Sequence, residues 1–231
     1  MKTNEFGQVI GEAVPGFTPG GLPTAASIEG RYTRLEKLNE SHKEALYAVY
    51  GPDTPAQMWT YLAGSSVANE AEWDDLFERL LRDSSKFYYV ILDKNTQKAL
   101  GTFALMRLDT ANRVVEIGSV TYLPELQRTR IATEAQYLMA RYVFEEMGYR
   151  RYEWKCDALN EPSKRAAKRL GFTYEGRFRQ AVVYKGRTRD TDWYSMIDQE
   201  WPKLKERFEK WLHPENFSEE GVQYHSLSQQ S

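Results

Sequence analysis

The sequence predicts a single α+β domain, and three observations carry this prediction. Residues 87–122 contain three consecutive strand patterns rich in aromatic and aliphatic residues. Residues 130–147 follow with the longest helical pattern of the chain, in which apolar residues recur at helical spacing. Strand and helix patterns then alternate and end in a hairpin pattern. Because no repeat or linker divides the chain, we expect one domain at residues 28–212.

The first half of the chain begins with a strand pattern and continues with helices. Ser41 and Glu44 have the spacing of a capping box, which predicts a helix from there to Tyr50. Pro55 stands at an early helical position, and Asn69 precedes an amphipathic run that ends near Arg82. The elements expected here are a strand at 28–35 and helices at 41–50, after 55 and at 69–82.

The second half has the more regular pattern. A turn at Asp93–Thr96 separates two strand runs, Gly148 ends the long helix, and Lys185–Arg187 is a tight turn. The expected strands are 87–92, 99–108, 113–122, 150–157, 172–178 and 182–196, and the expected helices are 130–147, 162–170 and 197–212.

Both ends of the chain differ in composition from the middle. Residues 1–27 are rich in Gly, Pro and Thr, so we expect an extended arm. Residues 213–231 are poor in apolar residues, which predicts a mobile tail. We find no pattern of a signal peptide and no apolar stretch near the roughly 20 residues of a membrane span.

Charge and cysteine content narrow the class of protein. The 231 residues include 31 Lys and Arg and 33 Asp and Glu, a formal net charge of -2, which argues against a nucleic-acid-binding protein. Cys156 is the single cysteine, so an intrachain disulfide is excluded and a reducing, cytoplasmic location is expected. His42, His213 and His225 are too far apart for a zinc motif, so we expect no metal.

Two motifs flank the long helix pattern and the strand after it. The first is Gln127-Arg128-Thr129-Arg130-Ile131-Ala132, which opens the helix and continues with Thr133. The second consists of Asn160, Ser163 and the pair Gly171-Phe172. With the order of elements around them, these motifs resemble the GNAT family of N-acetyltransferases, most closely its RimJ/RimL-like branch.

The resemblance implies a fold, an activity and a cosubstrate. The implied fold is a central mixed, mostly antiparallel sheet with helices on both faces. The implied activity is transfer of an acetyl group from acetyl-CoA to a primary amine by direct attack. The acceptor is then a protein N-terminus, as the branch suggests, or a small molecule such as a polyamine, an amino acid or an antibiotic.

The first motif has a physical reason to bind phosphate. A helix start exposes unpaired N–H groups and a partial positive charge, which suit a pyrophosphate. By resemblance, the segment Gln127–Thr133 contacts the cofactor. Arg130 occupies the place of a family glycine. Either Arg130 and Arg128 add charge pairing to the phosphates, or the bulk of Arg130 narrows the pocket.

Amine attack on a thioester requires a base, donors for the oxyanion and a proton for the thiolate. We expect Glu116 to be the base, with Glu134 as a second candidate. The resemblance assigns the oxyanion and the pantetheine to the backbone of Val120, Thr121 and Tyr122.

The proton donor follows from the second motif. Many family members have a tyrosine seven residues after the asparagine, and this position is Ala167 here. The RimL-like branch has a serine that matches Ser163, so we expect Ser163 to be the donor and Asn160 to hold the cofactor. The helix also carries four basic residues, which either meet the 3'-phosphate of CoA or form a solvated face: Lys164, Arg165, Lys168 and Arg169.

Other residues receive weaker expectations. Cys156 has no histidine near it in sequence, so we expect a buried, inert thiol rather than a nucleophile. Trp59, Tyr61 and Tyr184 are expected near the acceptor cleft, because the elements that carry them flank it in this fold.

Two alternatives to an enzyme remain open at this stage. A protein that binds or senses acyl-CoA without efficient catalysis would fit the change at Arg130. A partner-binding protein, or a homodimer, would use the N-terminal arm and the terminal helix as its surface. We expect no nucleic-acid or membrane partner.

Overall fold

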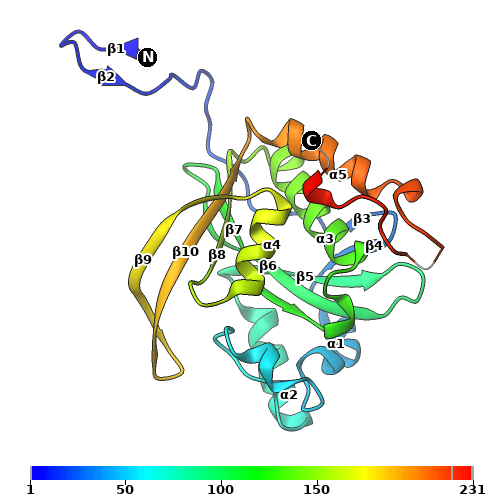
Figure 1. Ribbon diagram of the computed structural model, residues 1–231. Helices are drawn as coiled ribbons and strands as arrows, with labels where there is room; N and C mark the ends of the chain where they lie inside the picture. The colour runs from blue at the N-terminus through cyan, green and yellow to red at the C-terminus, as the bar shows by residue number, and fades with distance from the viewer. Residues whose placement is uncertain (1, 220, 230–231) are drawn as a thin grey trace.

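The computed structural model describes residues 2–219 and 221–229 and is built around one eight-stranded sheet (Figure 1). The strand order is β3-β4-β5-β6-β7-β8-β10-β9, and every neighbouring pair is antiparallel except β7 and β8, which are parallel. The strands are β3 (Ser27–Glu29), β4 (Thr33–Lys37), β5 (Lys86–Asp93), β6 (Ala99–Asp109), β7 (Val114–Tyr122), β8 (Arg151–Asp157), β9 (Thr173–Tyr184) and β10 (Arg187–Ile197).

Helices cover both faces of this sheet. They are α1 (Lys43–Tyr50), α2 (Glu70–Arg82), α3 (Arg130–Arg141), α4 (Glu161–Leu170) and α5 (Trp201–Leu212), and α3 continues into the π-helical turn η4 (Tyr142–Glu146). In Figure 1, α1 and α2 lie at the bottom of the view, away from α3, α4 and α5. The predicted mixed, mostly antiparallel sheet with helices on both faces is therefore confirmed.

The alternation of side chains along β5 shows how one strand serves two cores. Tyr89 and Ile91 belong to the core beneath α3 and α5, whereas Val90 and Leu92 belong to the core beneath α1 and α2. Successive side chains of a strand point to opposite faces, so a strand with a core on each side reads as a continuous apolar run. This explains the unbroken run at residues 87–92 in the sequence.

The first strand is the clearest error in the predicted elements. The sequence predicts one strand at 28–35, but the chain turns after β3 and returns as β4. The Glu134 carboxylate on α3 accepts the N–H groups of Arg31, Tyr32 and Thr33 at 2.7–2.8 Å. A residue one hundred positions away therefore stabilises this turn, and no local pattern reveals it.

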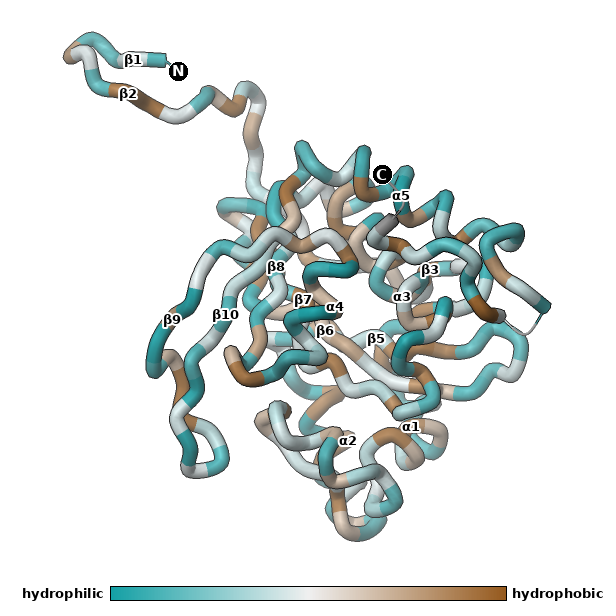
Figure 2. The backbone as a smooth tube through the Cα atoms, viewed as in Figure 1, coloured by the Kyte–Doolittle hydropathy of each residue, from teal (hydrophilic) through white to brown (hydrophobic). Residues whose placement is uncertain are grey.

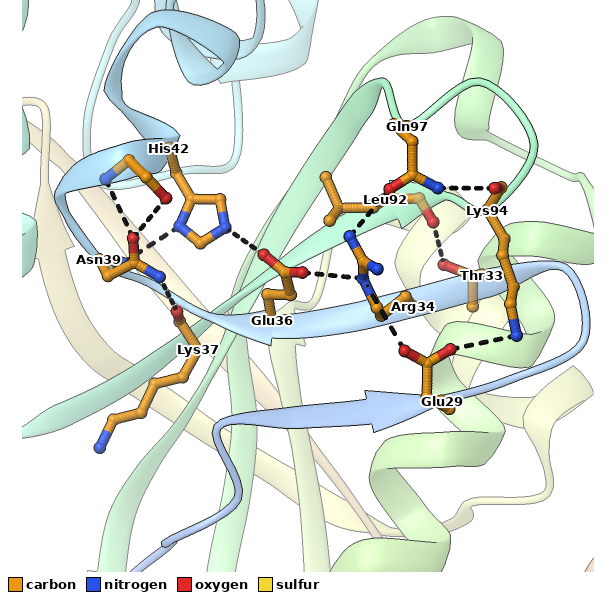
Figure 3. Close-up of polar contacts among 11 residues, drawn as sticks. Glu29, Thr33, Arg34, Glu36, Lys37, Asn39, His42, Leu92, Lys94 and Gln97 are labelled. Atoms are coloured by element: carbon orange, nitrogen blue, oxygen red, sulfur yellow. Dashed lines mark hydrogen bonds and ion pairs between the residues drawn. The ribbon is translucent and has the colours of Figure 1, made fainter.

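Figure 3 shows the polar contacts that connect β4 with the helix start that follows it. Glu36 on β4 binds Arg34 and the ring of His42, each at 2.8 Å. His42 in turn accepts the backbone N–H of Asn39, whose side chain caps the short helix η1 (Glu40–His42). The capping box therefore pairs Asn39 with His42, two residues before the predicted pair of Ser41 and Glu44.

The remaining predicted elements are present with shifted ends. The helix after Pro55 is the short 3-10 helix η2 (Ala56–Trp59), and the last helix begins at Trp201 rather than at Ile197. The turn between β9 and β10 lies at Lys185 and Gly186, both with positive φ, as a tight hairpin requires.

The parallel pair β7–β8 separates along its length, and this positions the functional site. Val114–Ile117 pairs with Arg151–Trp154, but from Gly118 onward β7 has no register with β8. β7 then bulges, because Ser119 and Val120 oppose the single residue Phe103 of β6, and Ser119 has a φ of 49°. The C-terminal ends of β7 and β8 therefore diverge.

The N-terminal segment has two parts. Residues 2–16 extend away from the domain and include the small hairpin of β1 (Lys2–Thr3) and β2 (Val9–Ile10), which carries apolar residues on an uncovered stretch (Figure 2). Residues 20–25 lie on the domain instead, where the Tyr142 hydroxyl accepts the N–H groups of Thr24 and Ala25.

The segment after α5 does not fit the mobile tail predicted from composition. It includes the 3-10 helices η5 (Pro214–Asn216) and η6 (Leu227–Gln229), and Phe217 and Leu227 are buried in the main core. The Asn216 side chain bonds to the backbone of Trp211 and His225, which holds the segment against α5. Few apolar residues are present here, but these two suffice to anchor it.

Candidate active site

A cleft of about 1090 Å³ opens where β7 and β8 diverge. Its lining includes Val120 and Thr121 of β7, Lys155 of β8, and Asn160 and Ser163 at the start of α4. Residues of α2 and of the β9–β10 hairpin complete the opposite end. The cleft therefore joins the side of the sheet that carries α4 to the side that carries α2.

Ser163 is held in a defined orientation at one end of the cleft. Trp154 on β8 donates its Nε1–H to Ser163 Oγ at 2.9 Å. Asn160 caps α4 by accepting the N–H of Ser163 at 3.1 Å. Because the indole occupies a lone pair of the serine oxygen, the serine proton remains available as a donor.

The start of α3 offers unpaired donors. Thr129 caps the helix by accepting the N–H of Ala132 on its side chain and that of Thr133 on its carbonyl. Among the described residues, the N–H groups of Arg130 and Ile131 have no such acceptor, as expected in the first turn of a helix. Gln127–Thr133 does not line the cleft itself.

The Arg130 side chain is directed into the protein's own aromatic residues. Its guanidinium carbon lies 4.4 Å from the ring centre of Tyr32 and 5.6 Å from that of Phe217. This packing removes the bulk of the side chain from the exposed amides beside it. A helical backbone at position 130 also needs no glycine, because the positive φ of this loop, 64°, falls on Arg128.

Basic residues of α4 differ in their surroundings. Lys164 pairs with Glu161 and donates to the carbonyl of Ala158, so it is already partnered. Arg169 donates to Thr133 Oγ1 of α3 at 3.1 Å and lies over the ring of Trp211. Burial, and then the neighbouring Arg207, lowers the pKa of Arg169. Arg165 and Lys168 are exposed.

Val120, Thr121 and Tyr122 are not equivalent. Val120 and Thr121 line the cleft, and their backbone belongs to the stretch of β7 that has no β8 partner. The Tyr122 hydroxyl accepts the side-chain N–H of Gln136 on α3 at 2.7 Å, outside the cleft lining. Burial raises the pKa of Tyr122.

Glu116 lies in a group of charges at the base of the cleft, in which the side chains of Glu116, Glu153 and Lys155 are buried and that of Arg107 is exposed. Lys155 Nζ is 2.9 Å from Glu116 Oε2 and 2.8 Å from Glu153 Oε2, and Arg107 Nε is 3.3 Å from Glu116 Oε2. Lys155 also lies over the ring of Trp193 at 3.7 Å. Burial raises the pKa of the Glu116 carboxyl, and Lys155 and Arg107 lower it by less.

Glu134 and Cys156 have surroundings that do not suit a reactive role. The Glu134 carboxylate already accepts three N–H groups of the β3–β4 turn and does not line the cleft. Cys156 lines the cleft but is 4% exposed, and burial raises the pKa of its thiol, against a smaller lowering by the Ser163 hydroxyl. A protonated thiol is a poor nucleophile.

The far end of the cleft is enclosed by the hairpin and by the loop after η2. Trp59 and Tyr61 line the cleft, and the Tyr61 hydroxyl donates to the carbonyl of Leu159. Tyr184 on β9 donates to the Asp157 carboxylate at 2.8 Å, and Lys185 donates to the carbonyl of Trp59 at 2.6 Å. These contacts hold the tip of the hairpin against the opposite wall.

Sequence reasoning missed Lys155, Arg107 and Trp154. Lys155 and Trp154 alternate on a strand whose faces could not be assigned without knowing its neighbours. Arg107 reaches Glu116 through an irregular stretch of β6, where it has a φ of 49°. Residues 116, 153 and 155 are charged positions in otherwise apolar strands. This pattern is the one sequence signal that could have identified the group.

Within the residues that the structure describes, no group of three or more His, Cys, Asp or Glu side chains is arranged to hold a metal ion. Over the same residues, no helix is both long and apolar enough to cross a membrane.

Comparison with known proteins assigns the family. The profile of the acetyltransferase (GNAT) domain matches residues 33–173, more than half of the chain. The chain belongs to the GNAT acetyltransferase family. Members of this family use acetyl-CoA as the acetyl donor, so the chain is an acetyltransferase of this class.

Individual relatives agree with this assignment. The chain resembles a GCN5-related N-acetyltransferase from Brucella melitensis, with a TM-score of 0.91 and 43% identity over 94% of this chain and 99% of that chain. It is 25% identical to the N-acetyltransferase YoaA of Bacillus subtilis over 71% of this chain and 92% of that protein. It is also 25% identical to the spermidine N(1)-acetyltransferase of Escherichia coli K12, over 73% of this chain and 85% of that protein.

The residues present fit a CoA thioester. Unpaired amides at the start of α3 suit the pyrophosphate, and a strand end without a β partner suits the amides of the pantetheine arm. Asn160 and Ser163 stand where the cleft meets α4. The side chain of Arg130 packs on Tyr32 and Phe217 beside these donors.

Proposed function

We propose that this GNAT protein transfers an acetyl group from acetyl-CoA to a primary amine by direct attack, in the cleft between β7 and β8. The observation that carries the proposal is the position of Glu116 and Ser163 on the lining of one cleft, on different elements. An acid and a base on the lining of one cleft match the two proton transfers of the reaction.

Glu116 acts as the general base. The amine must lose a proton to become a nucleophile, and a carboxylate accepts it directly or through one water molecule. Burial raises the pKa of Glu116, which makes the carboxylate a stronger base than an exposed glutamate. Lys155, 2.9 Å away, favours the ionised form of the carboxylate and so opposes part of the effect of burial on its pKa.

The other two requirements fall to the strand end and to α4. Backbone N–H groups around Val120, Thr121 and Tyr122 stabilise the negative charge that develops on the carbonyl oxygen. Ser163 donates its proton to the departing sulfur, since Trp154 already occupies an acceptor site of its oxygen. Asn160 and the amides of Gln127–Thr133 bind the cofactor, and Arg128, Arg165 and Lys168 provide exposed positive charge near its phosphates.

The acceptor is a primary amine on a protein N-terminus or on a small molecule. Resemblance to the RimJ/RimL-like branch supports the protein N-terminus. The similarity to a spermidine N(1)-acetyltransferase supports a small molecule, so family membership alone does not choose between them. A cytoplasmic location and the absence of nucleic-acid and membrane partners stay predictions from the sequence, as does a homodimer.

A test combines cofactor binding with turnover. Acetyl-CoA and CoA are each expected to raise the melting temperature, because a ligand that binds only the native state stabilises it by about 2.7 kcal/mol at 100 times its dissociation constant. Release of free thiol in the presence of an amine panel then measures transfer. Stabilisation without thiol release for any amine would favour the sensing alternative. The proposal is contradicted if millimolar cofactor neither raises the melting temperature nor supports thiol release.

A further inference from the structure

One row of side chains on β10 faces the cleft and has no role in the proposed chemistry. Arg189, Thr191 and Trp193 alternate along the strand and all line the cleft. Thr191 pairs across the sheet with Asp157, and Trp193 pairs with Lys155, which contacts Glu116. The row therefore leads away from the proposed base along the wall that faces α2.

Two polar atoms of this row are buried without a partner. Thr191 is 5% exposed, and its Oγ1 has no hydrogen-bond partner within the described part of the chain. The Nε of the half-buried Arg189 is likewise buried and unpartnered there. An unsatisfied buried donor costs about 1–3 kcal/mol, so such atoms in a binding cleft indicate groups that a ligand completes.

The acidic side chains near Arg189 on this wall already have other partners. Asp157 accepts from the Tyr184 hydroxyl and from the N–H of Leu159. Glu116 and Glu153 share Lys155. Within the described residues Arg189 has no acidic partner, and its only ring contact is with Tyr184 at 5.9 Å. The facing α2 wall contributes Glu72, Asp75 and Arg79, of both signs.

We infer that Arg189 and Thr191 bind a carboxylate of the acceptor, so that the acceptor class is an amine that also carries a carboxylate. A guanidinium presents parallel N–H donors that match the two oxygens of a carboxylate, and the threonine hydroxyl adds a third donor. A polyamine offers only cations and N–H donors, which the Thr191 hydroxyl can accept but which leave the Arg189 donors unsatisfied. This inference rests on the proposed function and names its substrate.

The spacing along β10 favours a peptide over a free amino acid. Thr191 and Arg189 stand two and four residues before Trp193 on β10, which corresponds to roughly 7 and 13 Å along a strand. The α-carboxylate of a free amino acid lies much closer than this to its amine. An acidic side chain one or two residues after a peptide N-terminus spans the distance, because an extended chain advances about 3.4 Å per residue.

The test compares matched acceptors. The peptide Ala-Glu-Ala-amide is paired with Ala-Gln-Ala-amide, and β-alanine is paired with its amide to represent free amino-carboxylates. Spermidine completes the panel. We expect kcat/KM for the acidic peptide to exceed that for its neutral partner by about 10- to 100-fold, the range of a hydrogen bond to a charged group.

Variants of β10 test whether Arg189 and Thr191 cause the preference for the acidic peptide. Arg189→Met and Thr191→Val keep the shape of each side chain and remove its donors, so the ratio between the two peptides is expected to fall toward one. Arg189→Lys keeps the charge but loses the fork, which predicts an intermediate ratio and provides a second variant if Arg189→Met does not fold. Arg179→Met, on the exposed neighbouring strand outside the cleft, is the control and keeps the wild-type ratio.

Each outcome separates the inference from the function on which it rests. A wild-type ratio near one, or faster acetylation of spermidine than of either peptide, overturns the inference while transfer to amines stands. If only β-alanine is preferred over its amide, the inferred carboxylate site stands, but the inference that the acceptor is a peptide is overturned. Absence of thiol release with every acceptor overturns the proposed function itself.

Discussion

The two ends of the cleft are built from different chemical groups. At the start of α4, within the lining, and at the start of α3, beside it, the donors are mainly backbone amides and residues at helix starts, and they come from two short stretches of sequence. At the end that faces α2, the groups are charged side chains on β6, β7, β8 and β10, which the sheet brings together. One end depends on backbone geometry and the other on side-chain identity.

This difference predicts how each end responds to substitution. A backbone donor survives a change of its own side chain, so the proposed phosphate site does not require glycine at position 130. A buried side-chain network does not tolerate such changes, because every removed group leaves a partner unsatisfied. We therefore expect large effects from the charged end and small ones from the helix starts.

The largest effect is expected at Glu116. Glu116→Gln keeps the size of the side chain and removes the base, so kcat/KM should fall on the order of 10²- to 10⁴-fold, the usual contribution of general base catalysis. Thiol release with a fixed amine measures it. Gln still accepts a hydrogen bond from Lys155, so we expect the variant to stay folded. An unchanged melting temperature would show that the loss of kcat/KM does not come from unfolding.

The pH profile sharpens the same prediction. A protonated carboxyl cannot accept a proton, so wild-type kcat/KM must fall as pH falls through the pKa of Glu116, which burial raises above the ordinary range. The acceptor amine contributes a separate acid limb. Glu116→Gln should retain only the limb of the amine, and an unchanged profile in the variant would assign the base elsewhere.

A smaller effect is expected at Ser163. Ser163→Ala removes one donor to the departing sulfur and should lower kcat by about 10- to 100-fold, because a hydrogen bond to a charged atom contributes about 1.5–3 kcal/mol. It also leaves the Trp154 N–H without its partner. Ser84→Ala, in an exposed turn outside the cleft lining, is the matched control and should leave kcat near the wild-type value.

The smallest effect on binding is expected at Arg130. Arg130→Gly restores the family residue and removes a side chain that packs on Tyr32 and Phe217. The dissociation constant of CoA, measured by titration calorimetry, should change less than about threefold. Stability to denaturant should fall by about 1–2 kcal/mol through the lost cation–π contacts and the glycine in a helix. A tenfold gain in CoA affinity would mean that Arg130 obstructs the site.

Sequence reasoning predicted the helix starts better than the side-chain contacts of the acceptor end, and the reason is physical. Capping residues are local patterns, so the starts of α3 and α4 and the Asn160 cap could be predicted, and they are present. The roles of Asn160 and Ser163 came from the family resemblance and stay predictions. The opposite end depends on which strands lie side by side. Lys155 meets Glu116 only because β7 and β8 are parallel neighbours over four residues, a fact that no local pattern contains.

The same limit explains the errors in the fold. The β3–β4 turn was missed because its amides bind Glu134, far along the chain. The segment after α5 was predicted to be mobile because its composition is polar, yet Phe217 and Leu227 find places in a core that distant residues form. Long-range partners decided these segments, whereas local patterns were sufficient for α2, α3 and the three-stranded meander.

A crystal structure of the protein with bound CoA tests the central claim most directly. We expect the pyrophosphate at the N–H groups of Arg130 and Ile131, the pantetheine arm beside Val120 and Thr121, and the sulfur within hydrogen-bond distance of Ser163 Oγ. Glu116 would then lie on the other side of the sulfur, with room for an amine between them. CoA bound with its sulfur outside the opening between β7 and β8 would contradict the account.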